Sequence, residues 1–319
     1  VLRRVGENKN SLPEIPNAGS AEHLSIKYSH PIWLVDRLIT ERGYDFTEAF
    51  LRCCNTPPGL DIQVNTLKVS ADDYARALAR SDIAHTLCDF PSGCITLHGG
   101  SVTALPGFEE GLFYVQDRAA RMAVEIAAPM PGMRVLDACS APGGKAFSAA
   151  VRMENRGSIL ACDIHEKKLA LIRQGAERLG IDIIATETRD ARRSDAALEG
   201  AFDVVIADVP CSGFGVIAKK PEIRSKTPES IAELPKIQGE ILDNVSKYVR
   251  PGGVLLYSTC TVTAEENENT VKAFLERNGE YTAEPFEVCG VSAPEGMYTF
   301  WPNVDGTDGF FAAKLRRRQ

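Results

Sequence analysis

The chain of 319 residues is 44% hydrophobic and 25% charged, the composition of a globular protein with room for about two domains. No apolar run approaches the roughly 18 residues of a membrane span, and no signal peptide is recognised. The nine cysteines lack the paired spacing of a zinc site and the density of a disulfide scaffold, so we expect a reducing, cytoplasmic environment. A formal net charge of −7 argues against wholesale nonspecific binding of nucleic acid but leaves room for a local basic groove.

The amino-terminal third is predicted to hold a linker and a small domain. Residues 1–25 are rich in Asn, Pro, Ser and Gly, which is typical of a linker. Two amphipathic helices are predicted between residues 30 and 54, and a strand, a helix and a second short strand follow them. This mixture predicts a small α+β domain over residues 26–108.

The remaining residues, 109–319, alternate between strand and helix patterns. Strands are predicted at 112–115, 134–139, 158–164, 182–187, 202–209 and 253–260, with helices at 118–128, 143–153, 166–179 and 236–249. Such alternation is typical of a doubly wound parallel sheet covered by helices on both faces. We therefore predict a Rossmann-like α/β domain.

A turn of small residues follows the second of these strands, in the stretch DACSAPGGK (137–145). Gly143 and Gly144 allow a ligand to approach the backbone closely, and the N–H groups of the helix start attract an anion. The turn lacks the glycine pattern of a phosphate-binding P-loop and that of a dinucleotide site. The sequence therefore predicts a cofactor turn of another kind.

Carboxylates stand at the ends of the next strands. Asp163 follows the glycines by about twenty residues, where α/β folds place a carboxylate on ribose hydroxyls. Asp190 ends the following strand and is predicted to accept a hydrogen bond from an adenine amino group, and Asp208 ends the one after. Together they indicate an adenosyl ligand, and S-adenosylmethionine and a dinucleotide remain alternatives on these residues alone.

Two cysteines end successive strands, Cys211 in DVPCSG and Cys260 in STC. The carboxyl ends of parallel strands meet at one edge of a sheet, so both thiols are expected beside the cofactor. Four interpretations are possible: the cysteines are buried apolar residues, they form a disulfide, they bind a metal ion, or they are catalytic. A disulfide is disfavoured in a cytosolic chain, and no His or Cys stands at metal-ligand spacing, so we expect no metal.

Catalysis by a thiolate requires an electrophile, and the C6 carbon of a pyrimidine is one. Addition there makes the neighbouring C5 carbon a nucleophile that can accept a methyl group. Asp208 is placed to assist at the N3 nitrogen, and a second thiol suits the later elimination. An ordinary thiol is largely protonated at neutral pH, so Lys145 or a helix terminus would have to lower its pKa.

The sequence as a whole resembles a known family. The motifs that carry the resemblance are DACSAPGGK, DVPCSG, STC followed by EEN, DGTDGFFAAKL, and, upstream, LSIKYSHPIWLVDRL, VNTLK and FYVQDRAA. They are similar to those of the NOL1/NOP2/Sun family of RNA (cytosine-5)-methyltransferases, which use S-adenosylmethionine. Within it, the chain is most similar to the Sun/RsmB type that modifies 16S ribosomal RNA.

The resemblance implies a role for each matching residue. Cys260 would be the nucleophile, Cys211 would promote release of the product, and Asp208 and Lys145 would orient or protonate the base. The residues expected to bind or line the site of S-adenosylmethionine are Cys139, Ser140, Ala141, Pro142, Gly143, Gly144, Lys145, Asp163, Asp190 and Asp208. One departure is Gln63, which stands where the family usually has an arginine before VNTLK.

RNA is the expected partner, and we expect a monomer. A basic cluster follows Cys211 and is predicted to contact RNA phosphates, the alternative being a solvated surface. It consists of Lys219, Lys220, Arg224 and Lys226. The target cytosine must be single-stranded or flipped out. The rival functions are an RNA-binding assembly factor with an inactive site, which the intact catalytic set disfavours, and an NAD(P)-dependent oxidoreductase, which the missing dinucleotide pattern disfavours.

Overall fold

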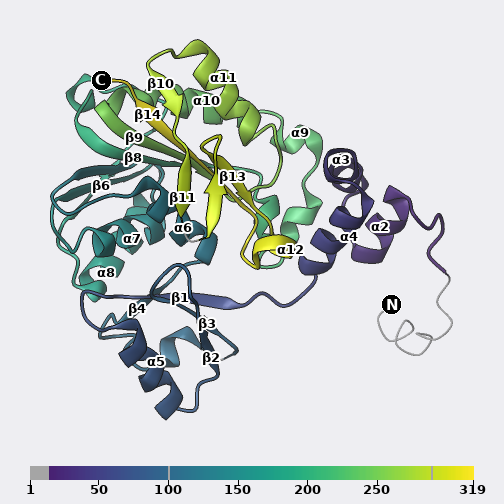
Figure 1. Cartoon of the computed structure of the whole chain (residues 1–319), viewed down its shortest axis with the longest axis horizontal. Helices are drawn as coiled ribbons and strands as arrows, with labels where there is room; N and C mark the ends of the chain where they lie inside the picture. Colours follow the sequence, from purple (N-terminus) through teal and green to yellow (C-terminus); the bar gives the residue numbers. More distant parts are fainter. Residues whose placement is uncertain (1–13, 100, 289) are drawn as a thin grey trace.

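The structure is a computed structural model and describes residues 14–99, 101–288 and 290–319. Three parts are visible in Figure 1: an amino-terminal group of helices, a small sheet with one helix, and a large sheet with helices on both faces. No helix among the described residues is long and apolar enough to cross a membrane.

The amino-terminal part consists of α2 (Ala21–Tyr28), α3 (Ile32–Arg42) and α4 (Tyr44–Cys53). Helix α2 begins inside the stretch predicted as a linker, residues 1–25, so the predicted linker is too long. The Ser20 side chain caps this helix by accepting a hydrogen bond from the amide of His23. Residues 1–13 of that linker lie outside the described residues. The buried faces of these helices pack against Phe214, Ile217 and Trp301 of the large domain rather than against the small sheet.

The small sheet is antiparallel, in the order β2-β3-β1-β4. Its elements are β1 (Leu60–Val64), α5 (Ala71–Arg80), β2 (His85–Leu87), β3 (Cys94–Leu97) and β4 (Phe113–Val115). The strand predicted at 112–115 therefore does not belong to the parallel sheet, since β4 pairs with β1. Its sequence pattern was correct, but periodicity does not specify the sheet that a strand joins. We therefore propose that the small domain extends to Val115.

The large sheet has the order β10-β14-β9-β8-β5-β6-β7, with β13 pairing on β14. Its parallel strands are β5 (Arg134–Asp137), β6 (Ser158–Asp163), β7 (Ile184–Thr188), β8 (Phe202–Asp208) and β9 (Val249–Thr259). The antiparallel edge is made of β10 (Tyr281–Ala283), β13 (Met297–Phe300) and β14 (Phe310–Arg317). A separate ribbon joins β11 (Phe286–Val288) to β12 (Val291–Ala293).

Helices cover both faces of the large sheet, as the alternating pattern predicted. They are α6 (Arg118–Ala127), α7 (Gly144–Arg152), α8 (Glu166–Leu179), α10 (Leu234–Val245) and α11 (Glu268–Arg277). One apolar core lies beneath α6, α7 and α8, and a second lies beneath α10 and α11. The short helices α9 (Pro228–Ile231) and α12 (Pro302–Asp305) lie beside α3 and α4 (Figure 1). The predicted Rossmann-like fold is confirmed.

Candidate active site

The cofactor turn connects β5 to α7 and is fixed by backbone hydrogen bonds. The amide of Ser140 donates to the carbonyl of Cys162 in β6 at 2.7 Å, and the amide of Gly143 donates back to Ser140 at 2.7 Å. Gly143 has a φ of +111°, and a Cβ atom there would lie 2.7 Å from the Phe147 ring. Only glycine fits this position, because both the backbone conformation and the close ring exclude a side chain.

Asp137, at the end of β5, is a candidate residue of the active site that the sequence patterns did not identify. Its carboxyl group is completely buried, and neither oxygen has a hydrogen-bond partner among the described residues. Burial raises the pKa of this carboxyl to about 7. The available signal was an aspartate directly before the small-residue turn, at a strand position where an apolar side chain is expected.

A cavity of about 530 Å³ lies beyond the carboxyl ends of β5, β6 and β8. The predicted residues that line it are Cys139, Ala141, Asp163, Asp190, Asp208, Cys211 and Cys260. The lining does not include Ser140, Pro142, Gly143, Gly144 or Lys145, which shape the turn and helix behind it. Sequence reasoning missed the apolar wall of Ile164, Ile237 and Ile241. Carboxylates facing an apolar wall fit an adenosyl group.

The two outer carboxylates differ in the acceptors they offer. Asp163 accepts a hydrogen bond from the amide of His165 through Oδ1 at 2.8 Å, and no bond is recorded to Oδ2 within the described chain. Asp190 accepts hydrogen bonds from Nε and Nη2 of Arg192 at 3.0 and 2.9 Å, which occupy both of its oxygens. Asp163 therefore offers the more available acceptor.

The two thiols both line this cavity, with their Sγ atoms 3.2 Å apart. A hydrogen bond from Cys211 lowers the pKa of Cys260, and the charges of Lys145 and Lys220 lower it further. The same contact, together with burial, raises the pKa of Cys211 well above its ordinary value. This contact therefore favours the arrangement with the proton on Cys211 and the negative charge on Cys260.

Asp208 is held in place from two sides. Nζ of Lys145 donates to its Oδ2 at 2.7 Å, and Oγ of Ser258 donates to its Oδ1 at 2.8 Å. Nζ of Lys145 also lies 4.9 Å from the centre of the Phe310 ring. The four residues predicted to be catalytic thus lie together at the carboxyl edge of the sheet.

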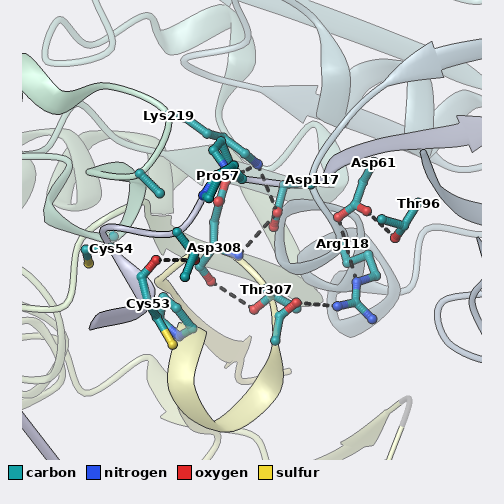
Figure 2. A pocket seen from close by; sticks show the side chains of 17 residues that line it. Cys53, Cys54, Pro57, Asp61, Thr96, Asp117, Arg118, Lys219, Thr307 and Asp308 are labelled. Atoms are coloured by element: carbon teal, nitrogen blue, oxygen red, sulfur yellow. Dashed lines mark hydrogen bonds and ion pairs between the residues drawn. The ribbon is translucent and has the colours of Figure 1, made fainter. Parts of the chain in front are cut away.

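The basic cluster predicted to contact RNA is mostly engaged within the protein. Figure 2 shows Lys219 between Asp117 and Asp308, at 3.2 and 2.6 Å, beside a second cavity of about 240 Å³. Arg224 donates to the carbonyl of Cys54 at 3.1 Å, and Lys226 donates to the carbonyl of Ser212 at 2.7 Å. Lys220 is exposed, and within the described residues no hydrogen bond or ion pair is recorded for its side chain.

Comparisons with known proteins agree with this geometry. Residues 124–316 match the family model described as 16S rRNA methyltransferase RsmB/F, and residues 30–103 match the ferredoxin-like domain of that family. A probable ribosomal RNA small subunit methyltransferase B from Bacillus subtilis is 34% identical over 92% of this chain and 68% of its own length. A counterpart from Escherichia coli is 33% identical over 100% of this chain and 72% of its own.

Solved structures share the arrangement of both domains. A methyltransferase homologue from Pyrococcus horikoshii superimposes with a TM-score of 0.82 and is 26% identical, covering 94% of this chain and 100% of its own.

Proposed function

The chain belongs to the RsmB/F family of 16S rRNA methyltransferases, which use S-adenosylmethionine, and we propose that it methylates the C5 carbon of a cytosine in small-subunit ribosomal RNA. The observation that carries the proposal is the pair of sulfur atoms, 3.2 Å apart and beside Asp208 at the end of the adenosyl-sized cavity. Methyl transfer to most other atoms of RNA needs no thiol, whereas transfer to a pyrimidine carbon needs a nucleophile that activates the ring.

The proposed cofactor supplies the methyl group. Asp163 would accept hydrogen bonds from the ribose, and the wall of Ile164, Ile237 and Ile241 would contact the adenine. The fixed turn from β5 to α7 keeps this end of the cavity open. Asp208 lines both the cavity and the thiol site, so it would connect cofactor and base.

The first step is addition of the Cys260 thiolate to C6 of the cytosine. A carbon–sulfur bond forms, the C5–C6 double bond opens, and its electrons move to C5. That carbon then takes the methyl group, and the leaving group would be the neutral thioether S-adenosylhomocysteine. Asp208, held by Lys145 and Ser258, would orient the base, and a proton passed from Lys145 through Asp208 to N3 would favour this electron shift. The hydrogen bond from Cys211 lowers the pKa of Cys260 and favours this thiolate, against the opposing effect of burial.

The second step restores the aromatic ring. A base removes the C5 proton, the C5–C6 double bond re-forms, and Cys260 leaves as a thiolate. Once Cys260 is a neutral thioether, its charge no longer raises the pKa of Cys211. Cys211 can then lose its proton to solvent, accept the C5 proton as a thiolate, and donate a hydrogen bond to the departing sulfur in its reprotonated form.

A denaturing gel with labelled RNA and S-adenosylmethionine tests this division of roles. Cys211→Ala should transfer the methyl group and then stall, leaving a protein–RNA adduct that survives denaturation. Cys260→Ala should form no adduct and transfer no methyl group. Cys53→Ala, which changes a thiol on α4, is the control and should turn over normally.

Two results would contradict the proposal. An adduct trapped by Cys260→Ala would reverse the roles of the thiols. No adduct in either variant, with bound RNA and no methylation by the wild type, would favour a binding factor with an inactive site.

A further inference from the structure

The backbone around Cys211 is held by two buried side chains, Gln238 of α10 and Glu266, which we call the Cys211 clamp. Nε2 of Gln238 donates to the carbonyl of Pro210 at 3.0 Å, and the amide of Ser212 donates to Oε2 of Glu266 at 2.9 Å. Gln238 also donates to Oε2 of Glu266 at 2.8 Å. The clamp thus fixes the peptide units on both sides of Cys211.

The clamp is tied to the segment that follows β9 and carries Cys260. Oγ1 of Thr263 donates to Oε1 of Glu266 at 2.9 Å. The hydroxyl groups of Ser212 and Thr261 lie 2.7 Å apart, and these are the residues that directly follow Cys211 and Cys260. The distance between the two sulfur atoms is therefore set by a buried network rather than by a flexible loop.

The charge of Glu266 is not needed for these hydrogen bonds. Its side chain is only 2% exposed, and no ion pair joins it to any Lys, Arg or His of the described residues. A glutamine could accept the same two bonds through one oxygen and donate to Thr263 through its amide nitrogen. Replacing Glu266 by glutamine therefore removes the acidic group while keeping these hydrogen bonds.

The charges around the thiol pair are distributed unequally. The pKa of Cys211 is raised most by the contact with Cys260 and by burial. The negative charges of Glu266 and Asp208 raise it further. On the other thiol, Lys145 and Lys220 lower the pKa of Cys260, against the opposing charge of Asp208. Asp208 thus acts on both thiols, whereas the charge of Glu266 acts on Cys211 and the charges of Lys145 and Lys220 act on Cys260.

We infer that Glu266 is a positioning residue that holds the Cys211 turn and keeps the shared proton on Cys211, so that Cys260 carries the negative charge. The inference rests on the proposed roles of the two cysteines. The position of the proton, however, can be measured with neither RNA nor S-adenosylmethionine present.

Alkylation of each thiol by iodoacetamide, followed by peptide mass spectrometry from neutral to alkaline pH, measures this directly. The wild type should react at Cys260 well before Cys211. Glu266→Gln should lower the ratio of the alkylation rate of Cys260 to that of Cys211. The ratio should fall by about threefold for each unit by which the pKa of Cys211 falls, since the thiolate fraction rises while its nucleophilicity declines. Glu265→Gln is the matched control, because Glu265 pairs with Arg37 at the surface, and its ratio should equal that of the wild type.

A second variant separates charge from geometry. Gln238→Met removes the donor to Pro210 but leaves the carboxylate, so the ratio should change little. An equal fall of the ratio in Gln238→Met and Glu266→Gln would overturn the role of the charge. So would an unchanged ratio in Glu266→Gln, or a wild-type protein that reacts first at Cys211.

Turnover provides a readout that loss of structure would not imitate. Glu266→Gln should lower kcat several-fold, leave KM for RNA and for S-adenosylmethionine unchanged, and recover activity as pH rises and Cys260 ionises. Failure of the adduct experiment on Cys211→Ala would reject the proposed function while leaving the alkylation result intact, so the two failures are distinguishable.

Discussion

Asp163 combines two properties expected of a cofactor ligand, burial and an available oxygen. Its Oδ1 is held by the amide of His165, and the carboxylate lines the cavity at the end of β6. Asp163→Ala should weaken binding of S-adenosylmethionine by about 1.5–3 kcal/mol, the range of a hydrogen bond to a charged group. Calorimetry measures this affinity. Asp182→Ala, an exposed position before β7, should bind like the wild type, and wild-type affinity in both variants would remove Asp163 from the site.

The sequence could predict those residues of the site that lie at or just after the ends of strands. Cys211, Cys260 and Asp208 each end a strand, and parallel topology brings such ends together. Gln238 and Glu266 could not be found in this way, because they act through hydrogen bonds to Pro210 and Ser212, 28 and 54 residues away. Burial of a polar side chain is decided by packing, which one-dimensional periodicity does not describe.

The loop between β8 and α10 forms the rim of the site and is held by ion pairs. Lys219 lies between Asp117, which also caps α6, and Asp308, which precedes β14 (Figure 2). Burial, and then the nearby charge of Asp117, raises the pKa of Asp308 to about 7. Lys219 thus connects three segments of the chain and reduces the repulsion between two carboxylates.

Replacing Lys219 should destabilise the protein in a pH-dependent manner. The folded pKa of Asp308 lies above the unfolded value, so its contribution to stability is present at low pH and is lost as pH rises towards about 7. Lys219→Met extends this loss, so we expect a cost of about 1–2 kcal/mol near pH 8 and roughly half of that near pH 5, allowing for partial exposure. Thermal unfolding at both pH values checks this. A cost that did not grow with pH would contradict it.

Lys220 is the member of the basic cluster best placed to contact RNA. It is exposed, and its charge acts on Cys260. Lys220→Met should weaken RNA binding and make the plot of log affinity against log salt shallower by about 0.7–0.9, the contribution of one phosphate contact. Fluorescence anisotropy over a salt series measures the slope. An unchanged slope would return the cluster to the interpretation of a solvated surface.

Helices were easier to predict than the way in which elements assemble. The predicted helix at 166–179 coincides with α8, because its apolar spacing and the terminal Gly180 define both ends. The strand at 112–115 was predicted, but the sheet to which it belongs was not. Its pairing with β1 depends on a turn at Gly107 and Gly111. Similarly, Lys219 and Arg224 of the rim loop were identified as basic from the sequence, but their partners could not be, because these lie about 90 to 170 residues away.

The two domains are joined at the carboxyl end of α8. Asn65, in the VNTLK motif, is completely buried, and its Nδ2 donates to the carbonyls of Gly111 and Leu179 at 2.9 and 2.8 Å. Nζ of Lys68 donates to the carbonyl of Arg178 at 3.0 Å. Gly111 must be glycine, since a Cβ atom there would lie 1.9 Å from the carbonyl oxygen of Arg178. The motif that identified the family thus serves to dock the small sheet.

This junction lies at the opposite end of α8 from Asp163, so docking and cofactor binding should be separable. Asn65→Ala leaves two buried carbonyls without a donor, at a cost of about 2–4 kcal/mol. Hydrogen exchange should increase in β1, β4 and the last turn of α8, and RNA affinity should fall because the small domain loses its fixed orientation.

Binding of S-adenosylmethionine should be unchanged in Asn65→Ala, since the β5–α7 turn and Asp163 make no contact with Asn65. Lys68→Met is the control, because Lys68 also donates to a carbonyl at this helix end, that of Arg178, but at an exposed site, where the loss of stability should be within about 0.5 kcal/mol. Equal losses of cofactor and RNA affinity in Asn65→Ala would mean that Asn65 supports the whole fold. A selective loss of RNA affinity would identify the small domain as the part that places the RNA over Cys260.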